Sequence, residues 1–240
     1  MAKPAARRPA AGPRSRRAAA PGAPQARTSA AAADDDIRER ALAATRRLLV
    51  DRRFDQISVA DILDGAEISR GSFYFYFDGK YDVLAELVRR AVSRGHEAAG
   101  PWLSHEGPDE RLATVVAGIS EGAKLWQREA PVLRAIVENW RSDSRLSELW
   151  LGQMEGFTAV TAERIEADRD GKEPVRARPD ARALASALTW LGERLYYLAA
   201  IGVAPFDDQR ALVDVLTYIW MATLYPDEMP HGRDHRATNR

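Results

Sequence analysis

The chain of 240 residues has no cysteine, which excludes disulfide bonds, thiolate chemistry and zinc sites built on thiolates. It also has no apolar run that approaches the roughly 20 residues needed to cross a bilayer. Its four histidines lack the spacing of metal ligands, and no phosphate-binding loop is present. These absences predict a cytoplasmic protein that has no membrane partner and uses no cofactor or metal.

Acidic residues are missing from the first 33 residues, although the formal net charge of the whole chain is zero. Alanine and proline fill the spaces between the basic residues, which are Lys3, Arg7, Arg8, Arg14, Arg16, Arg17 and Arg27. Such a segment cannot bury enough apolar surface to fold, so we expect a disordered basic arm over residues 1–33 and a disordered polar tail over residues 227–240. The arm either attracts phosphate groups in a salt-dependent way or is an incidental extension.

The rest of the chain shows apolar residues at helical spacing. A first helix is expected after Asp34, Asp35 and Asp36, whose charges favour a helix N-terminus. A long helix is expected over residues 79–99, before Gly100 and Pro101. The other expected elements are helices with apolar stripes at residues 112–126, 132–140 and 146–165, a polar loop over residues 168–179, and two last helices over residues 180–203 and 208–225. The pattern predicts an all-α fold.

Residues 58–77 have the pattern of two short helices joined by a tight turn. Ser58 can cap the first helix by accepting a hydrogen bond from a free backbone N–H, and Gly65 is expected to end that helix. Ser69 is a second N-cap candidate, so a new helix starts about four residues after the first one ends. This spacing indicates a helix-turn-helix unit.

The second of these helices is rich in aromatic residues. Phe73 and Phe77 are four residues apart and share the face that should pack inward. Arginine, serine and tyrosine on the other positions suit a helix pressed into a groove of DNA, since hydroxyls reach phosphates and arginine binds guanine edges. The alternative interpretation is an aromatic core segment of a helical bundle.

The run from Ile68 to Phe77, followed by Lys80, resembles the DNA-binding domain of TetR-type transcriptional repressors, with Tyr74 at the spacing of that domain. The rest of the chain is similar in layout to the ethionamide-resistance repressor branch of this family. The residues that carry this second resemblance are Glu148, Leu149, Trp150, Glu193, Arg194, Ile219 and Trp220.

The resemblance implies a three-helix helix-turn-helix DNA-binding domain over residues 34–79 and a helical ligand-binding and dimerisation domain over residues 80–226. It implies a regulator, by family default a repressor, that binds a palindromic double-stranded DNA operator as a homodimer and responds to a hydrophobic small molecule. The expected DNA contacts are Ser58, Arg70, Gly71, Ser72, Tyr74, Tyr76 and Lys80, with Lys80 as a phosphate ligand and Arg46 and Arg47 as secondary candidates.

Aromatic residues are spread over several of the later helices, which must meet in one bundle. Aromatic walls with a few polar groups suit an elongated apolar ligand, although aromatic residues at helical spacing are also common in plain cores. The expected ligand contacts are Trp126, Trp140, Trp150, Met154, Phe157, Thr189, Trp190, Tyr197 and Trp220. Where the resembled branch has two asparagines that bind ligands, this chain has Thr189 and Gly192, so its effector can differ.

The last two expected helices carry apolar stripes too broad for the core of one subunit. In the resembled family the equivalent pair from each subunit forms a four-helix dimer interface, and a dimer brings two recognition helices to two half-sites of DNA. The expected interface residues are Leu184, Ala187, Leu188, Leu191, Leu195, Leu212, Val215, Leu216 and Ile219. The alternative is a monomer whose own core these stripes fill.

The stretch from Gly118 to Gly122 matches the G-x-S-x-G pattern of a hydrolase nucleophile elbow, with Ser120 as the nucleophile. That elbow requires a strand, a sharp turn and a helix, whereas one helical period runs straight through this segment. The later histidines lie in the polar tail. We therefore expect no enzyme, and the alternative hypothesis is a helical small-molecule-binding or hydrolytic protein.

Overall fold

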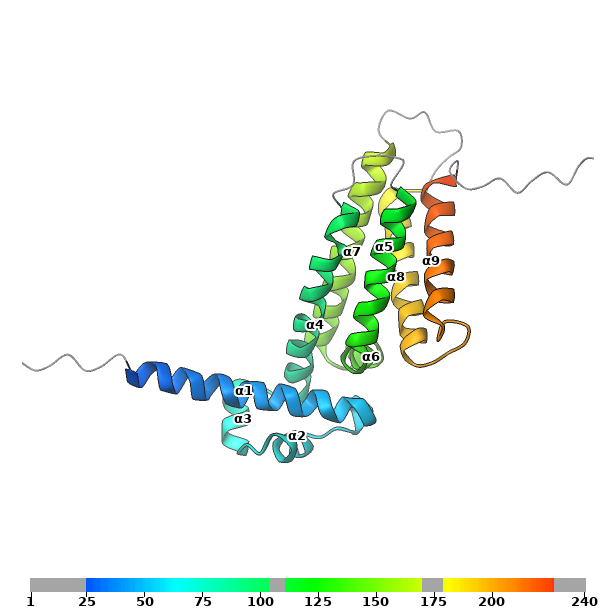
Figure 1. Cartoon of the computed structure of the whole chain (residues 1–240). Helices are drawn as coiled ribbons and strands as arrows, with labels where there is room; N and C mark the ends of the chain where they lie inside the picture. The colour runs from blue at the N-terminus through cyan, green and yellow to red at the C-terminus, as the bar shows by residue number, and fades with distance from the viewer. Residues whose placement is uncertain (1–24, 104–110, 170–178, 227–240) are drawn as a thin grey trace, which may run out of the picture. The chain divides into compact units, whose positions relative to one another are not determined.

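The computed structural model describes residues 25–103, 111–169 and 179–226, and within these ranges it contains helices and no strand (Figure 1). The all-α prediction is confirmed. The chain divides into two compact units, Met1–Asp36 and Ile37–Arg240, and the contacts described below lie within the second unit. We call residues 37–79 the head, and the helices that follow the bundle. No helix in the described ranges is long and apolar enough to span a membrane.

The elements of the head are the later part of α1 (Gln25–Asp51), the 3-10 turn η1 (Phe54–Gln56), α2 (Val59–Ala66) and α3 (Arg70–Tyr76). Both predicted N-caps are confirmed. Ser58 accepts a hydrogen bond from the Asp61 backbone N–H at 3.1 Å, while the Asp61 carboxylate accepts one from the Ser58 backbone N–H at 2.7 Å. Ser69 accepts from the Ser72 backbone N–H at 3.0 Å. Because these caps satisfy N–H groups that have no partner inside the helix, the local sequence fixes both helix starts.

The turn between α2 and α3 differs from the prediction that Gly65 ends the helix. α2 continues to Ala66, and Glu67 adopts the left-handed conformation, with φ of 54°, that terminates it. Gly65 instead faces α1, and a Cβ at this position would lie 3.4 Å from the Cβ of Ala44, in van der Waals contact. The glycine is therefore a packing residue and not the helix stop.

Two arginines of α1 hold the end of α2. Arg40 donates to the Glu67 carbonyl at 2.8 Å, and Arg47 donates to the Gly65 carbonyl at 2.7 Å. The last carbonyls of a helix have no partner within it, so these bonds stabilise the turn. Arg47, expected as a secondary phosphate contact, thus has a structural partner inside the chain.

Two helices extend beyond their predicted boundaries. α1 begins at Gln25, so residues 25–33 of the predicted disordered arm are helical, which the high helix propensity of the alanines at residues 30–33 favours. α4 continues to Leu103, past the predicted stop at Gly100 and Pro101, because a proline in the last turns removes only one hydrogen bond of a helix of 24 residues. The rest of the predicted arm, the C-terminal tail and residues 170–178 of the predicted loop lie outside the described residues.

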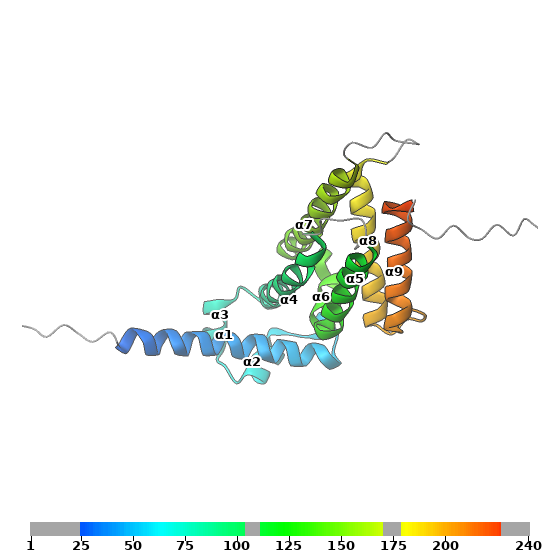
Figure 2. The same ribbon diagram turned by 45° about the horizontal axis from the view of Figure 1, so that its top comes forward.

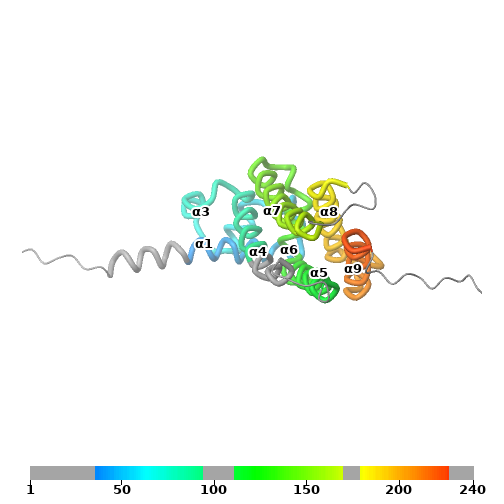
Figure 3. The backbone as a smooth tube through the Cα atoms, turned by 90° about the horizontal axis from the view of Figure 1, so that it is seen from above, coloured from blue at the N-terminus to red at the C-terminus, as the bar shows by residue number. Residues whose placement is uncertain are grey.

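The elements of the bundle are α4 (Lys80–Leu103), α5 (Arg111–Arg128), α6 (Ala130–Asn139), the 3-10 turn η3 (Trp140–Ser142), α7 (Ser144–Arg169), α8 (Ala181–Ala200) and α9 (Gln209–Leu224). α4 packs along α5, α7 along α8, and α9 against α5 (Figure 2). Seen along the bundle, α8 and α9 lie on the side opposite α3 (Figure 3). Pro131 lies in the first turn of α6, where a proline costs no hydrogen bond within the helix.

One hydrophobic core joins the head to the bundle. Phe54, Ile62 and Phe73 of the head are fully buried in the same cluster as Leu84 and Val88 of α4, and this cluster continues into α6 and α7. Protein interiors are close-packed, so a shift of one element displaces its neighbours. A movement of the first turns of α4 should therefore displace the head as well.

A partly buried ion pair makes a second link between the head and the bundle. Arg46 of α1 lies 2.6 Å from the carboxylate of Glu129, a residue between α5 and α6 that is only 3% exposed. Asp78 of the head also pairs with Arg145 of α7 at 2.8 Å, but both side chains are exposed, so this pair contributes little. Arg46, expected as a secondary phosphate contact, is thus engaged within the chain.

We expect Arg46→Met to lower the free energy of unfolding by about 1.5–3 kcal/mol, because the buried Glu129 carboxylate loses the guanidinium that lies 2.6 Å from it. Arg47→Met is the matched control on the same helix, since it removes one exposed hydrogen bond and should cost under about 1 kcal/mol. Urea denaturation of both variants measures the difference. Equal losses would show that the Arg46 pair is no stronger than an exposed one.

Candidate functional site

The outer face of α3 is exposed while its inner face is buried. Phe73 and Phe77 pack into the core, as the sequence predicts. On the other positions Tyr74 is 46% exposed and Phe75 is 76% exposed. The alternative interpretation was an aromatic core segment of a helical bundle. It does not fit α3, because one side of this helix is exposed.

Arg70 and Gly71 form the exposed first turn of α3. The Arg70 guanidinium lies 5.6 Å from the centroid of the Tyr74 ring, and it makes no ion pair within the described part of the chain. A Cβ built on Gly71 has only the Ser69 hydroxyl nearby, at 3.8 Å. This turn therefore combines a cation without an ionic partner and a backbone that another molecule can approach closely.

Three other predicted DNA contacts already have partners in the fold. Ser58 is part of its capping box, and the Ser72 hydroxyl lies 2.8 Å from the Ser69 hydroxyl. Tyr76 is half-buried, and its ring meets Phe75 edge-on at 4.8 Å. Contacts of these residues with DNA stay predictions.

Phe75 is the most exposed large hydrophobic side chain among the residues described. The sequence pattern does not single it out, because a phenylalanine between two tyrosines is also typical of a core. A phenyl ring on this free side of α3 suits contact with an apolar group such as the methyl group of thymine. It joins Arg70 and Tyr74 as a candidate contact residue.

Lys80 does not have the position expected of a phosphate ligand. Its ammonium donates to the carbonyls of Phe54, Asp55 and Ile57 at 3.1, 3.3 and 2.7 Å, and burial lowers the pKa of Lys80. An ammonium has three donors, and all three are used inside the chain. Lys80 therefore clamps η1 and Ile57, the residue after it, and no N–H of its ammonium is left free for the expected phosphate in this structure. The sequence could not reveal this because the three carbonyls lie 23 to 26 residues earlier.

We expect Lys80→Met to lower the free energy of unfolding by about 1–3 kcal/mol, since three carbonyls lose a charged donor. The slope of log affinity for DNA against log salt concentration should stay unchanged, because no phosphate contact is lost. Urea denaturation and a salt titration of DNA binding measure the two effects. A slope smaller by about one unit would mean that Lys80 does bind a phosphate.

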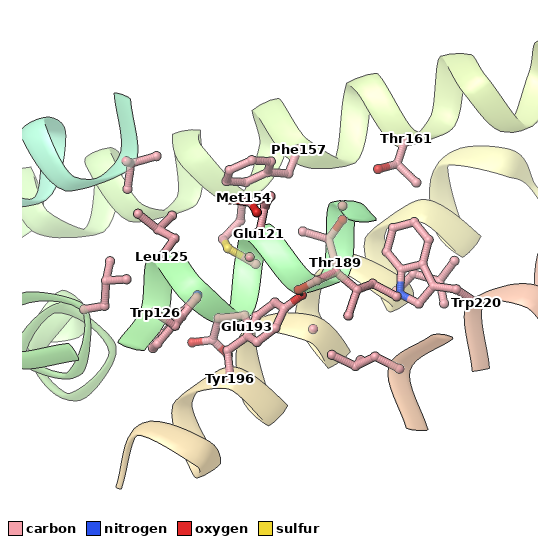
Figure 4. Close-up of a pocket in the computed structure, with 18 of the residues that line it drawn as sticks. Glu121, Leu125, Trp126, Met154, Phe157, Thr161, Thr189, Glu193, Tyr196 and Trp220 are labelled. Atoms are coloured by element: carbon pink, nitrogen blue, oxygen red, sulfur yellow. The ribbon is translucent and has the colours of Figure 1, made fainter. Parts of the chain in front are cut away.

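A cavity of about 200 Å³ lies inside the bundle and has lining residues on every helix from α4 to α9 (Figure 4). The predicted ligand contacts that line it are Trp126, Trp150, Met154, Phe157, Thr189 and Trp220. In Figure 4, Trp126 and Trp220 lie at opposite ends of the view, with Glu121 and Glu193 between them. The cavity is thus an aromatic chamber with acidic groups along its middle.

Trp140, Trp190 and Tyr197 do not line this cavity. Trp140 belongs to η3, where Arg141 lies over its ring, and the Tyr197 hydroxyl donates to the Glu138 carboxylate at 3.1 Å. Trp190 is half-buried and packs on the main core. Their aromatic character is used for packing between helices, so their assignment to this site is corrected.

Polar groups are few in the cavity wall. Glu193 of α8 is only 6% exposed, and burial raises the pKa of its carboxyl. Glu121 of α5 pairs with Lys124 at 2.6 Å, which lowers the pKa of Glu121. The indole N–H of Trp150 has no acceptor among the described residues. The sequence pattern missed both carboxylates, because an acid on an amphipathic helix is normally a solvated residue.

Tyr196 forms part of the wall by packing closely against α5. Its hydroxyl donates to the Ile119 carbonyl at 3.0 Å, and its ring stacks on Trp126 with centroids 6.2 Å apart. A Cβ on Gly122 would lie 2.7 Å from that hydroxyl. A glycine at position 122 is therefore needed for Tyr196 to take this place.

We expect Gly122→Ala to lower the free energy of unfolding by about 1–3 kcal/mol, because the new methyl group displaces the Tyr196 hydroxyl from the Ile119 carbonyl. Gly152→Ala is the matched control in an exposed helical position with nothing within 4 Å, and it should stabilise the chain by about 0.5–1 kcal/mol. Thermal denaturation distinguishes the two. Stabilisation by both substitutions would contradict the close packing at Gly122.

The predicted dimer residues fall into two groups. Leu188, Leu195, Leu212 and Leu216 are buried within the single chain, and Leu188 and Leu216 line the cavity. These four fill the core of the chain, so their assignment to a subunit interface is corrected. The members that keep exposed surface are Leu184, Ala187, Leu191, Val215 and Ile219, and the exposed Tyr218 lies on the same helix as the last two.

Gly118, Ser120 and Gly122 lie inside α5. A nucleophile elbow needs a sharp turn between a strand and a helix, and the described residues contain no strand. The hydrolase alternative therefore lacks its geometry. Within the described ranges, no group of three or more histidine, cysteine, aspartate or glutamate residues could hold a metal ion.

Two family models match the chain. The model described as bacterial regulatory proteins, tetR family, matches residues 41–87, and the model described as transcriptional regulator EthR, C-terminal domain, matches residues 115–226. The chain is 32% identical over 202 residues to the HTH-type transcriptional regulator EthR of Mycobacterium tuberculosis, which covers 84% of this chain and 93% of that protein. It is 32% identical over 205 residues to the EthR of Mycolicibacterium smegmatis, with coverage of 84% and 92%.

Solved structures share the fold. The fatty acid degradation regulator FadR of Bacillus halodurans matches with a TM-score of 0.62 and 16% identity, over 79% of this chain and 96% of that one. GusR of Salmonella enterica matches with a TM-score of 0.58 and 13% identity, over 78% and 95% of the two chains. At these identities the likeness concerns the fold alone.

Proposed function

Because the chain belongs to the TetR family of bacterial transcriptional regulators, within its EthR branch, we propose that it is a repressor that binds a palindromic operator as a homodimer and is released by a hydrophobic small molecule. Such a regulator works on cytoplasmic DNA. The observation that carries the proposal is the exposed first turn of α3, where Arg70 and Gly71 are free while Phe73 anchors the helix in the core.

In this proposal α3 enters the major groove. Arg70 forks onto a guanine edge, and the backbone at Gly71 approaches the DNA because no side chain intervenes. The exposed Tyr74 hydroxyl binds a phosphate, and Phe75 contacts a thymine methyl group or the sugar edge. Direct base contacts thus come from one short helix. A single subunit makes too few of these contacts for specific binding.

A second copy supplies the other half-site. The surface proposed for dimerisation consists of apolar residues of α8 and α9 that keep exposed surface, among them the half-buried Leu191 and the exposed Val215 and Tyr218. Exposed apolar residues grouped on two neighbouring helices are typical of an interface. A symmetric pair places two α3 helices on half-sites about one duplex turn apart or more.

The proposed effector site is the cavity in the bundle. Val92 of α4 lines it, and the first residue of α4, Lys80, is bonded to η1 of the head. Trp126 of α5 also lines it and lies in the turn before Glu129, the partner of Arg46 in α1. A ligand that separates α4 from α5 would therefore move the head by two routes, and the two heads of the dimer would no longer fit their half-sites.

We expect Arg70→Ala to weaken binding to a selected operator by about 1–3 kcal/mol and to relax the choice of base at one position of each half-site. Gly71→Ala should weaken operator binding as well, because a methyl group then separates the backbone from the DNA, whereas the chain alone should be as stable as before or slightly more stable. Selection of duplexes from a random palindromic library, followed by mobility-shift titrations at fixed salt, measures both effects.

Arg169→Ala is the control for charge, because it removes an arginine at the C-terminal end of α7, outside the head and outside the two helices proposed for dimerisation. It should leave operator affinity unchanged. If Arg169→Ala weakened binding as much as Arg70→Ala, the loss would reflect total charge and not base recognition. If neither α3 variant changed affinity, α3 would not be the helix that contacts DNA.

A further inference from the structure

The two carboxylic acids among the residues that line the cavity are its only charged side chains. Glu121 and Glu193 face it, while no lysine, arginine or histidine is among its lining residues. The rest of the wall is aromatic, aliphatic, hydroxyl or glycine. The charge of the cavity wall is therefore negative, in an otherwise uncharged lining.

The two carboxylates differ in how well they are already paired. Glu121 has Lys124 at 2.6 Å. Glu193 is buried, accepts no hydrogen bond from any described residue, and has its nearest cation, the exposed Arg194, at 3.9 Å. Burial raises the pKa of Glu193, which is the cost of holding a charge there. A buried acceptor without a hydrogen-bond donor lowers the stability of the chain. A ligand that supplies the donor removes this cost, which adds to its binding free energy.

The aromatic walls suit the same kind of ligand. The faces of tryptophan and tyrosine rings attract cations, and Trp126, Tyr196 and Trp220 line the cavity together with Glu193. The size of the cavity limits the ligand: a cavity of about 150 Å³ accepts benzene, so about 200 Å³ suits one ring with a short alkyl chain.

On top of the proposed role of the cavity as an effector site, we propose that the effector is a small hydrophobic amine, whose ammonium group pairs with Glu193 and whose apolar body lies against the tryptophan rings. Charge-assisted hydrogen bonds are about twice as strong as neutral ones. An ammonium group therefore gains more from Glu193 than a hydroxyl or an amide of the same shape does.

The test uses four probes of the same skeleton on the full chain: phenylpropylamine, phenylpropanol, phenylpropanamide and phenylpropanoate. Calorimetric titration at neutral pH, supported by quenching of tryptophan fluorescence, measures each affinity without DNA. We expect the amine to bind at least about tenfold more tightly than the alcohol and the amide, and the acid to bind least.

Two variants of the same wall locate the effect. Glu193→Gln should remove the advantage of the amine over the alcohol while the alcohol still binds, which shows that the cavity remains intact. Glu121→Gln is the matched control, because Glu121 lines the same cavity but already has Lys124, and it should keep the advantage of the amine. The proposal is overturned if the amide, alcohol or acid binds as tightly as the amine, if no probe binds at millimolar concentration, or if the advantage survives in Glu193→Gln.

The same samples separate this inference from the regulator hypothesis. Operator binding by the unliganded chain is measured in a mobility-shift titration that contains no probe. A chain that prefers the amine through Glu193 but binds no duplex supports the amine site and contradicts the regulator. A chain that binds its operator but shows no preference for the amine contradicts the amine site alone.

Discussion

The burial of Phe73 is the constraint on which the head depends. A helix of seven residues is not stable in water without tertiary packing, and α3 has just that length. Phe73 is fully buried and packs on Phe77 with ring centroids 5.6 Å apart, so these two side chains hold the helix on the core. Phe75 lies about half a turn around the helix from these two side chains, so the helical period places it outside, and Tyr74 also keeps exposed surface. The exposed surface of α3 is thus a direct consequence of which residues it buries.

The sequence predicted those parts of the fold that depend on interactions between residues close together in the chain. The caps at Ser58 and Ser69, the inward phenylalanines and the order of the helices all follow from residue type and spacing. Features that depend on distant residues were not predictable. The carbonyls around Lys80 belong to η1 and to Ile57 after it, and the space beside Gly122 is filled by Tyr196 from another helix. A helical stripe likewise does not distinguish a leucine that faces a partner from one that faces the cavity.

The cavity and the head are connected because the same helices serve both. α4 carries Val92 into the cavity wall and Lys80 into the head, and a helix resists bending between these points. The pair between Arg46 and Glu129 connects α1 to the junction of α5 and α6, next to the wall residue Trp126. Coupling between sites requires an element whose arrangement both sites bias. Here α4 and the α5–α6 junction are the elements in contact with both.

A carboxylate in an apolar cavity also acts against ligands. Specificity is a difference between affinities, and an unfavourable contact with the wrong ligand contributes to it as much as a favourable contact with the right one. Glu193 adds nothing to the binding of a neutral apolar molecule, which the aromatic wall alone would hold. It does oppose anionic amphiphiles such as fatty acids, because a second carboxylate beside it would be buried without a counter-ion. The burial of this acid is therefore explained by the anionic ligands that it excludes together with the proposed amine that it binds. A leucine at position 193 would make the chain more stable and the cavity less selective.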